Sequence, residues 1–324
     1  MEERPSQEPE SHGEPEFLYH YTTQEGLLGI LKDKCIWATH IRYLNDTSEG
    51  KFVLDCLLDE ISRNYELPKE WRAFLGTFNE PVTEKCNPVD SSIIEAGLSV
   101  AIWATSPTVF VASFSAKGDS LSQWRAYSGE SGGYSVAFRT AYLRSIGEEF
   151  LMGRDDRFMT SDVLIRCGYY ESKTKSSFER EVRDTVASYI AQASSGDRGT
   201  AGEMQEHRSS QPIAAAHFLP LCTYIAKLKH AGFSDESEWR LGFYLQPNSI
   251  PADLCLRAGS SMLVPYLEIP LGVTGKFSVV GLNEIVVGPC PHPEESRKSV
   301  EMLLHQAGFK GVQVKSSQIP YRNW

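Results

Sequence analysis

The sequence lacks long apolar runs, paired cysteines and a recognisable leader. No uncharged apolar run approaches the ~18 residues that a membrane-spanning helix needs. Residues 1–16 have neither a cationic start nor an apolar core, which argues against a secretory signal peptide. The seven cysteines are widely scattered and form no CxxC pair, so we expect reduced thiols and no structural zinc site. These absences predict a cytoplasmic protein without a membrane anchor.

Positive charge is also scarcer than negative charge, and several common catalytic motifs are missing. The chain has 32 Lys and Arg against 42 Asp and Glu, and half of its net charge of −10 lies in residues 1–16. An acidic balance disfavours a protein that coats nucleic acid by neutralising phosphates. GxGxxG, Walker A and HExxH motifs are absent, and so is a carboxylate cluster suited to metal ions. A nucleic-acid-processing enzyme is therefore disfavoured.

What is present is the composition of a globular protein. The 324 residues are 41% hydrophobic and 23% charged, which is enough to bury a substantial core. Residues 1–16 are rich in Glu, Pro and Ser and are predicted to be a disordered acidic tail. Residues 194–211 have the composition of a flexible insertion. No repeat or boundary divides the rest, so residues 17–324 are expected to form a single domain.

The apolar pattern predicts short strands mixed irregularly with helices. Strands are predicted at 17–21, 35–39, 109–115, 134–138, 163–170, 239–245, 263–269, 284–287 and 311–314. Helices are predicted at 24–31, 45–61, 68–75, 93–104, 121–127, 178–190, 212–229 and 293–306. Because strands and helices do not alternate regularly, we expect an α+β fold with a mixed, mainly antiparallel sheet around a cleft and flanking helices.

Two polar clusters near the N-terminus are candidates for a site. His20 ends a strand that leads into a helix, where its ring can bind a ligand or can simply bond to a buried backbone carbonyl. In the second cluster, Asn45-Asp46 makes an adequate turn and helix N-cap. Arg42 and Glu49 could add a ligand contact there, although a surface ion pair explains them too.

Two further clusters combine hydroxyl, aromatic and charged side chains. Ser113 and Ser115 are two apart on a predicted strand, so both hydroxyls point to the same side. Trp124 and Tyr127 are three apart and share one helix face, where core packing would also account for them.

The last cluster, ESEWR, places a carboxylate and a guanidinium together. Glu238 and Arg240 lie on the strand face opposite Trp239. They can pair with each other or bind a hydroxyl and a phosphate, and a solvated strand edge explains them about as well.

The ordered segments YHYT, CIWAT, LND..E, SFS, W..Y, E.EWR and EIVVGP resemble an uncharacterised bacterial domain family over roughly residues 17–290. The opening, a strand ending in His-x-Thr that leads into a helix and a second strand, is similar to the start of ADP-ribosyltransferases. This second resemblance covers about thirty residues. It implies an ADP-ribosyltransferase-like fold, with NAD as substrate and no metal.

The resemblance also implies residue roles. His20 would hydrogen-bond the adenosine ribose of NAD with support from Thr22, and Tyr43 or Tyr127 would stack on the nicotinamide. The complete set of expected binding residues is His20, Tyr21, Thr22, Tyr43, Ser113, Ser115, Trp124, Tyr127 and Arg240.

A glutamate on a late strand would bind the nicotinamide ribose and stabilise the oxocarbenium-like transition state. Glu238 is the first candidate for this role and Glu284 is the second. The expected function is transfer of ADP-ribose from NAD to a protein or nucleic-acid acceptor, or hydrolysis of NAD, in a toxin or phage-defence setting. The alternative is a non-catalytic sensor module that binds a nucleotide or a partner in the same cleft.

Overall fold

The computed structural model describes most of residues 13–44, 109–170, 225–245, 250–272 and 281–322. The insertion predicted at 194–211, the helices predicted between 45 and 104 and almost all of the helix predicted at 178–190 lie outside the described residues. Residues 13–16, which the sequence analysis placed in the tail, are described. Glu16 pairs with Arg139 at 2.6 Å, and Glu14 pairs with Arg144 at 2.6 Å.

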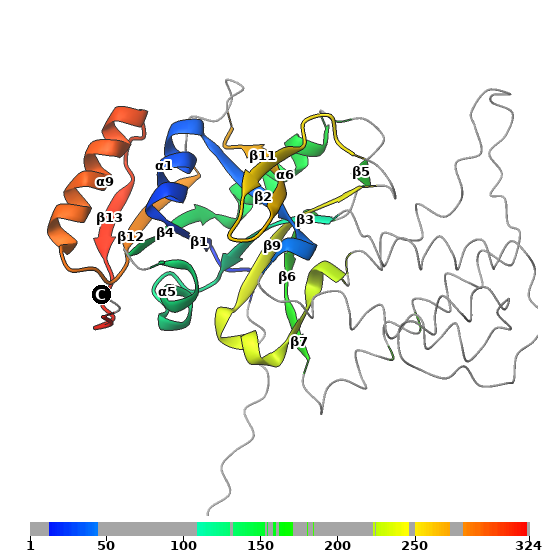
Figure 1. Ribbon diagram of the computed structural model, residues 1–324, viewed down its shortest axis with the longest axis horizontal. Helices are drawn as coiled ribbons and strands as arrows, with labels where there is room; N and C mark the ends of the chain where they lie inside the picture. Colours follow the sequence, from blue (N-terminus) through cyan, green and yellow to red (C-terminus); the bar gives the residue numbers. More distant parts are fainter. Residues whose placement is uncertain are drawn as a thin grey trace, which may run out of the picture.

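Eleven of the described strands form one sheet (Figure 1). Its main order is β10-β11-β2-β3-β1-β4-β12-β13. Outside this order, β9 pairs with β3, and β5 and β6 pair with β9. The strands are β1 Phe17–Thr23, β2 Cys35–His40, β3 Val109–Ser115, β4 Gly133–Arg139, β5 Phe158–Met159, β6 Leu164–Arg166, β9 Glu238–Leu245, β10 Cys255–Ala258, β11 Leu263–Pro270, β12 Leu282–Val287 and β13 Gln313–Ser316. Their described pairings are antiparallel except that of β12 with β13.

The remaining described elements are helical or belong to a small second sheet. The α-helices are α1 Gln24–Asp33, α5 Leu121–Tyr127, α6 Thr140–Met152 and α9 Pro293–Ala307, and the 3-10 helices are η1 Ile41–Tyr43 and η2 Ala231–Glu236. Strands β7 Gly168–Tyr170 and β8 Leu228–His230 pair in parallel. The predicted mixed α+β class with a mainly antiparallel sheet is confirmed.

Two predicted elements differ from the structure. The strand predicted at 163–170 divides at Cys167 into β6, which pairs with β9, and β7, which pairs with β8. The helix predicted to run through residue 229 gives way at Leu228 to strand β8. Both changes follow from the β7–β8 pairing, which joins segments about sixty residues apart and has no local sequence signal.

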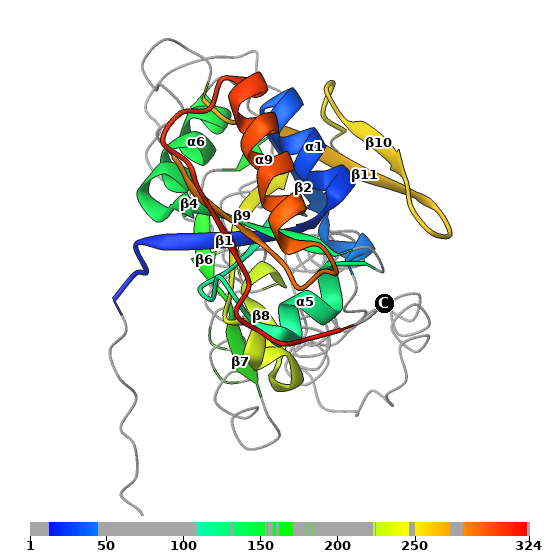
Figure 2. The same cartoon turned by 90° about the vertical axis from the view of Figure 1, so that its left-hand side faces the viewer.

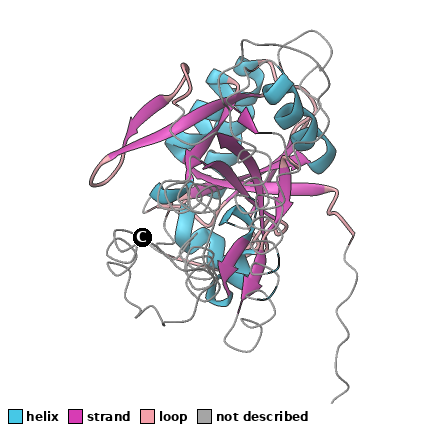
Figure 3. Cartoon of the chain, turned by 90° about the vertical axis from the view of Figure 1, so that its right-hand side faces the viewer, coloured by secondary structure: helices cyan, strands magenta, loops and turns pink. Residues whose placement is uncertain are grey.

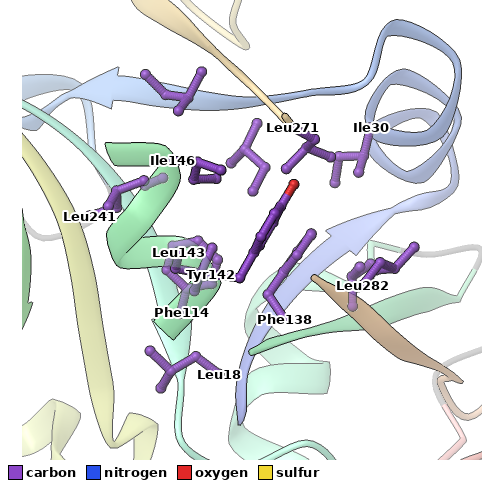
Figure 4. Packing of buried hydrophobic residues seen from close by; sticks show 14 of the residues in the cluster. Leu18, Ile30, Phe114, Phe138, Tyr142, Leu143, Ile146, Leu241, Leu271 and Leu282 are labelled. Carbon is purple, nitrogen blue, oxygen red and sulfur yellow. The ribbon is translucent and has the colours of Figure 1, made fainter. Parts of the chain in front are cut away.

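Alternation along the strands gives the sheet two different faces. Helices α1 and α9 lie side by side on one face, and α5 lies on the other side of β1 (Figure 2). The first face carries the main core, which includes Leu18, Phe114 and Phe138 together with Tyr142 and Leu143 of α6 (Figure 4). The second face has a smaller apolar cluster under α5, formed by Tyr21, Trp124 and Val286.

Local signals explain where α1 begins and ends. The Thr23 hydroxyl accepts a hydrogen bond from the Gly26 N–H at 3.2 Å, a typical helix N-cap. Lys34 ends the helix in the left-handed region with φ of 52°. Leu27, Ile30 and Leu31 between them are buried and follow helical spacing. The short connection brings β2 back to the same sheet as β1.

Strands β10 and β11 form a two-stranded arm that extends from the edge of the sheet (Figure 3). Strand β11 pairs with β2 from Tyr266–Thr39 to Pro270–Cys35, whereas β10 pairs only with β11 among the described strands. The sheet therefore stays continuous from this arm to β3, which positions the candidate site.

Replacing Phe138 by Ala is expected to destabilise the fold by about 3–5 kcal/mol. The side chain is fully buried in the main core, so its removal leaves a cavity. Urea unfolding followed by circular dichroism would measure the loss. Met152→Ala is the matched control, since Met152 is 84% exposed, and it should change stability by less than about 0.5 kcal/mol. Equal effects of the two substitutions would contradict this assignment of the core.

Candidate functional site

Strand β3 is the centre of the candidate site because three strands pair with it. Strand β9 follows one edge of β3 from Val109–Tyr244 to Ser115–Glu238. Strands β1 and β2 share the other edge, where β1 pairs at Ser115 and β2 pairs at Phe110 and Val111. Among the described strands, none pairs with residues 112–114 on this edge. The two strands thus diverge from β3, and we call this place the fork.

His20 occupies the fork. Its Nδ1 lies 2.9 Å from the carbonyl oxygen of Ser113, so Nδ1 carries the proton and donates, which makes Nε2 the acceptor nitrogen of the neutral ring. The ring also packs against Phe114, with ring centroids 5.6 Å apart. Burial lowers the pKa of His20, so the ring is neutral at pH 7. A bond to a backbone carbonyl was one of the two interpretations that the sequence left open.

The predicted serines and charged residues lie on one face of the sheet, and His20 belongs to the other. Ser113 is opposite Arg240 and Ser115 is opposite Glu238, so the four side chains share a face. His20 follows the alternation of Leu18 and Phe114, which point into the main core. The predicted group is therefore divided by the backbone of β3, with His20 reaching that backbone at Ser113.

Both candidate glutamates lie in one row across the sheet. Glu238 is opposite Ser115, Ser115 is opposite Tyr19, and Tyr19 is opposite Ala137, which faces Glu284. Glu238 and Glu284 are therefore on the same face, at opposite ends of the row. Lys315 pairs with Glu284 at 2.5 Å from the neighbouring strand β13.

Glu238 is the centre of a buried charge cluster that also contains Lys229, Glu236 and Arg240. The residue is 3% exposed. Oε1 accepts from Arg240 Nε at 2.9 Å, and Oε2 accepts from Lys229 Nζ at 2.9 Å and from Arg240 Nη2 at 3.2 Å. Burial opposes ionisation of the carboxyl, but Arg240 and Lys229 outweigh it and lower the pKa of Glu238 to about 2. The carboxylate is thus charged throughout the physiological range.

The two cations of the cluster have further partners. Lys229 Nζ also donates to Glu236 Oε2 at 2.7 Å, so a single ammonium joins two carboxylates. Arg240 is fully buried, and its Nη1 donates to the carbonyl of Ala226 at 3.0 Å. Although burial opposes its charge, Glu238 and Glu236 raise the pKa of Lys229 above its usual range. The cluster contains two positive and two negative groups.

Hydroxyl groups surround the cluster. The Glu238 N–H donates to the Tyr169 hydroxyl at 2.7 Å, and the Ser115 hydroxyl donates to the Glu236 carbonyl at 2.6 Å. Burial first, and then the charges of Glu236 and Glu238, raise the pKa of Tyr127 to about 12. The structure thus brings Ser115, Tyr127, Glu238 and Arg240 of the predicted set together.

The other predicted aromatic residues have packing roles. Tyr21 and Trp124 meet edge to face with centroids 4.7 Å apart, and both are buried. Tyr43 lies in η1, is 39% exposed, and meets His40 edge to face at 5.4 Å. Thr22 is partly buried near the end of β1. Core packing, the alternative left open for Trp124, therefore accounts for its position.

Sequence reasoning missed Lys229, which belongs to the cluster, and Tyr169, whose hydroxyl lies beside it. They come from β8 and β7, which pair at Tyr169–Lys229. The closest sequence signal was the charged run from Lys227 to Glu238, which contains Lys229 but gives no reason to bury it. Tyr169 had no signal beyond its place in a predicted strand.

Stability is expected to fall as the pH drops from about 6.5 toward 4, partly because of His40. Burial and the nearby Arg42 lower the pKa of His40 to about 4, so the unfolded chain binds this proton first and acid favours unfolding. The contribution is fully present above pH ~6.5, and about 2 kcal/mol of it should be lost by pH 5.

Urea unfolding of the wild type and His40→Asn at pH 7 and pH 5 would measure this loss. Asn keeps an acceptor for the Arg42 N–H, which His40 Nδ1 binds at 3.3 Å, but does not titrate. The variant should lose less stability on acidification than the wild type. An unchanged pH dependence in His40→Asn would assign the acid sensitivity to other groups.

Two features are missing from the part of the chain that the structure describes. Within these residues, no three His, Cys, Asp or Glu side chains gather in a way that could hold a metal ion. None of the described helices is long and apolar enough to cross a membrane.

Comparison with known proteins gives one partial match. Residues 123–241 match the model of a family described as a protein of unknown function, DUF2971. No curated protein and no solved structure matches the chain. The matched stretch runs from α5 into β9 and contains Trp124, Tyr127, Glu238 and Arg240. It is consistent with the expected resemblance to an uncharacterised domain family, within narrower bounds than 17–290, and it shows no resemblance to ADP-ribosyltransferases.

Proposed function

We propose that the protein binds NAD at the fork and cleaves the bond between nicotinamide and ribose. The observation that carries this proposal is that β3 joins His20, at the fork, to the permanently ionised Glu238 on the next strand. Cleavage of a glycosidic bond develops positive charge on the ribose, which a fixed carboxylate stabilises. The proposal includes an ADP-ribosyltransferase-like arrangement of the sheet around the ligand.

The reaction balances without a metal or a redox partner. The bond between ribose C1′ and the nicotinamide nitrogen breaks, and its electron pair neutralises the pyridinium of the leaving group. A nucleophile on a protein or nucleic-acid acceptor, or water, then bonds to C1′ and loses its proton to solvent. Glu238 contributes charge rather than proton transfer, because a carboxyl with a pKa of about 2 is a poor base near pH 7.

In this proposal NAD passes through the fork, so that its two ends contact groups on opposite faces of the sheet. His20 Nε2 accepts a hydrogen bond from a hydroxyl of the adenosine ribose, while Nδ1 stays bonded to Ser113. Tyr127 of α5 packs against the nicotinamide. A hydroxyl of the nicotinamide ribose replaces Lys229 at Glu238 Oε2, and Lys229 keeps its bond to Glu236. The shared ammonium allows this exchange without leaving Lys229 unpaired.

The test is incubation of the purified protein with labelled NAD, alone and with cell extract, while nicotinamide release and label transfer are measured. His20→Asn is the sharpest variant, because Asn can still donate to the Ser113 carbonyl but has no equivalent of Nε2. We expect kcat/KM to fall at least tenfold, the cost of about one lost hydrogen bond to the ligand.

His292→Asn is the control for this variant, because His292 is exposed, precedes α9 and has no described contact with His20 or Ser113. It should keep wild-type turnover. Equal turnover in His20→Asn and the wild type would remove His20 from the site. Absence of NAD turnover by the wild type in either condition would reject the proposed reaction.

The second candidate function is a non-catalytic module that binds a nucleotide or a partner. The full pairing of both Glu238 oxygens and its near-complete burial favour this alternative, since they are also what a structural ion cluster has. Isothermal titration with NAD distinguishes the two functions. Binding without nicotinamide release would support the binding module. In a toxin or phage-defence setting, the protein would then act as a sensor and would not modify a target.

A further inference from the structure

We infer that Asp119 is a positioning residue, which holds α5 through the segment 317–319 and so fixes Tyr127 beside the charge cluster. This inference rests on the proposed function, because it concerns the same site. It adds a group that contacts neither the fork nor Glu238.

The Asp119 carboxylate joins two distant segments with three hydrogen bonds. Its Oδ1 accepts from Trp124 Nε1 at 2.6 Å and from the Ser317 hydroxyl at 2.6 Å. Its Oδ2 accepts from the Gln318 N–H at 2.8 Å. One side chain thus ties the first turns of α5 to a segment almost 200 residues later, and bonds to a charged acceptor are strong.

The segment after β13 also covers α5 by packing. Ile319 packs against the small cluster of Tyr21, Trp124 and Val286. Arg125 lies over the ring of Tyr321 at 5.4 Å from its centroid. Figure 2 shows this red C-terminal segment passing along α5. The helix is therefore held on one side by β1 and on another by this segment.

Tyr127 lies one turn after Trp124, so the bonds that fix Trp124 also set the place of Tyr127. The helix contacts η2, which carries Glu236 and leads into Glu238. Tyr127 itself packs beside Trp124, and it lies close enough to Glu236 and Glu238 for their charges to raise its pKa. A helix of only seven residues has little stability of its own and needs such anchors.

A double-mutant cycle between Asp119 and Tyr127 tests the inference. Asp119→Asn keeps an oxygen for Trp124 and Ser317 but replaces the acceptor of the Gln318 N–H by an amide donor. We expect it to lower kcat/KM for NAD about tenfold when Tyr127 is present and less than twofold in a Tyr127→Ala background. The same loss in both backgrounds would overturn the inference. Asp253→Asn is the matched control, because it alters a carboxylate that pairs with Arg154. It should leave kcat/KM unchanged in both backgrounds.

Hydrogen exchange gives a readout that does not need turnover. If the inference holds, Asp119→Asn speeds amide exchange at residues 121–127 and at residues 231–238 together, and Asp253→Asn speeds neither. Faster exchange confined to residues 317–322, or absent from 231–238, would overturn it. A wild type without NAD turnover would reject the proposed function alone, and the exchange data would then decide the positioning role.

Discussion

Replacing Glu238 by Gln should lower the rate of nicotinamide release by about 10²–10³-fold, the usual effect of removing one preorganised electrostatic group from an active site. The substitution keeps the side-chain shape but removes the charge that the developing oxocarbenium ion requires. Initial rates from labelled NAD would measure the effect, and the fraction of folded enzyme must be determined in parallel. Gln would leave the buried cations Lys229 and Arg240 without the negative charge of Glu238, so the variant should lose some stability as well.

Glu284→Gln is the matched control because Glu284 lies at the other end of the same row. It pairs with Lys315 and has no described contact with Lys229 or Arg240. Its turnover should stay within about twofold of the wild type. A collapse in Glu284→Gln with normal turnover in Glu238→Gln would exchange the two roles, and normal turnover in both would favour the binding module.

Replacing Arg240 by Ala should destabilise the protein by about 3–5 kcal/mol, which is the cost of leaving a buried charge without its partner. Arg240 is fully buried and makes two bonds to Glu238 and one to the Ala226 carbonyl. Its removal leaves a carboxylate at 3% exposure with Lys229 as its remaining cation. Denaturant unfolding at pH 7 would measure the loss.

Arg297→Ala is the control for that measurement. Arg297 pairs with Glu294 and Glu301 on the surface of α9. Surface pairs of this kind contribute less than about 1 kcal/mol, so the control should remain close to the wild type. A loss below about 1 kcal/mol in Arg240→Ala would mean that water or a rearranged Lys229 compensates Glu238, and the buried cluster would not be a stability determinant.

Short-range patterns predicted much of this site. Strand alternation placed Glu238 with Arg240, and Ser113 with Ser115, and the register between β3 and β9 confirms that all four share a face. Strands at Phe17 and at Trp239 were expected in one sheet and do belong to one sheet. Periodicity is sufficient for such predictions because it depends only on neighbouring residues.

Contacts between distant segments account for what the sequence did not predict. Helix α6 is an exception, because Tyr142, Leu143, Ile146 and Phe150 follow helical spacing and so gave a local signal that the prediction missed. Lys229 reaches Glu238 because β8 pairs with β7, and the Cys167 N–H between β6 and β7 donates to the Glu238 carbonyl at 2.9 Å. Such pairings are set by tertiary packing, which a single sequence does not display.

The place of β3 between early and late strands has a consequence for the nascent chain. One edge of β3 is completed by β9, which begins at residue 238, more than a hundred residues after β3 ends at residue 115. At a synthesis rate of roughly 5–20 residues per second, that edge of β3 stays unpaired for on the order of ten seconds until β9 has been made. An apolar strand with an unpaired edge invites association with other chains. Ribosome-bound chains that end before residue 238 should therefore depend on chaperones more than chains that extend past residue 245.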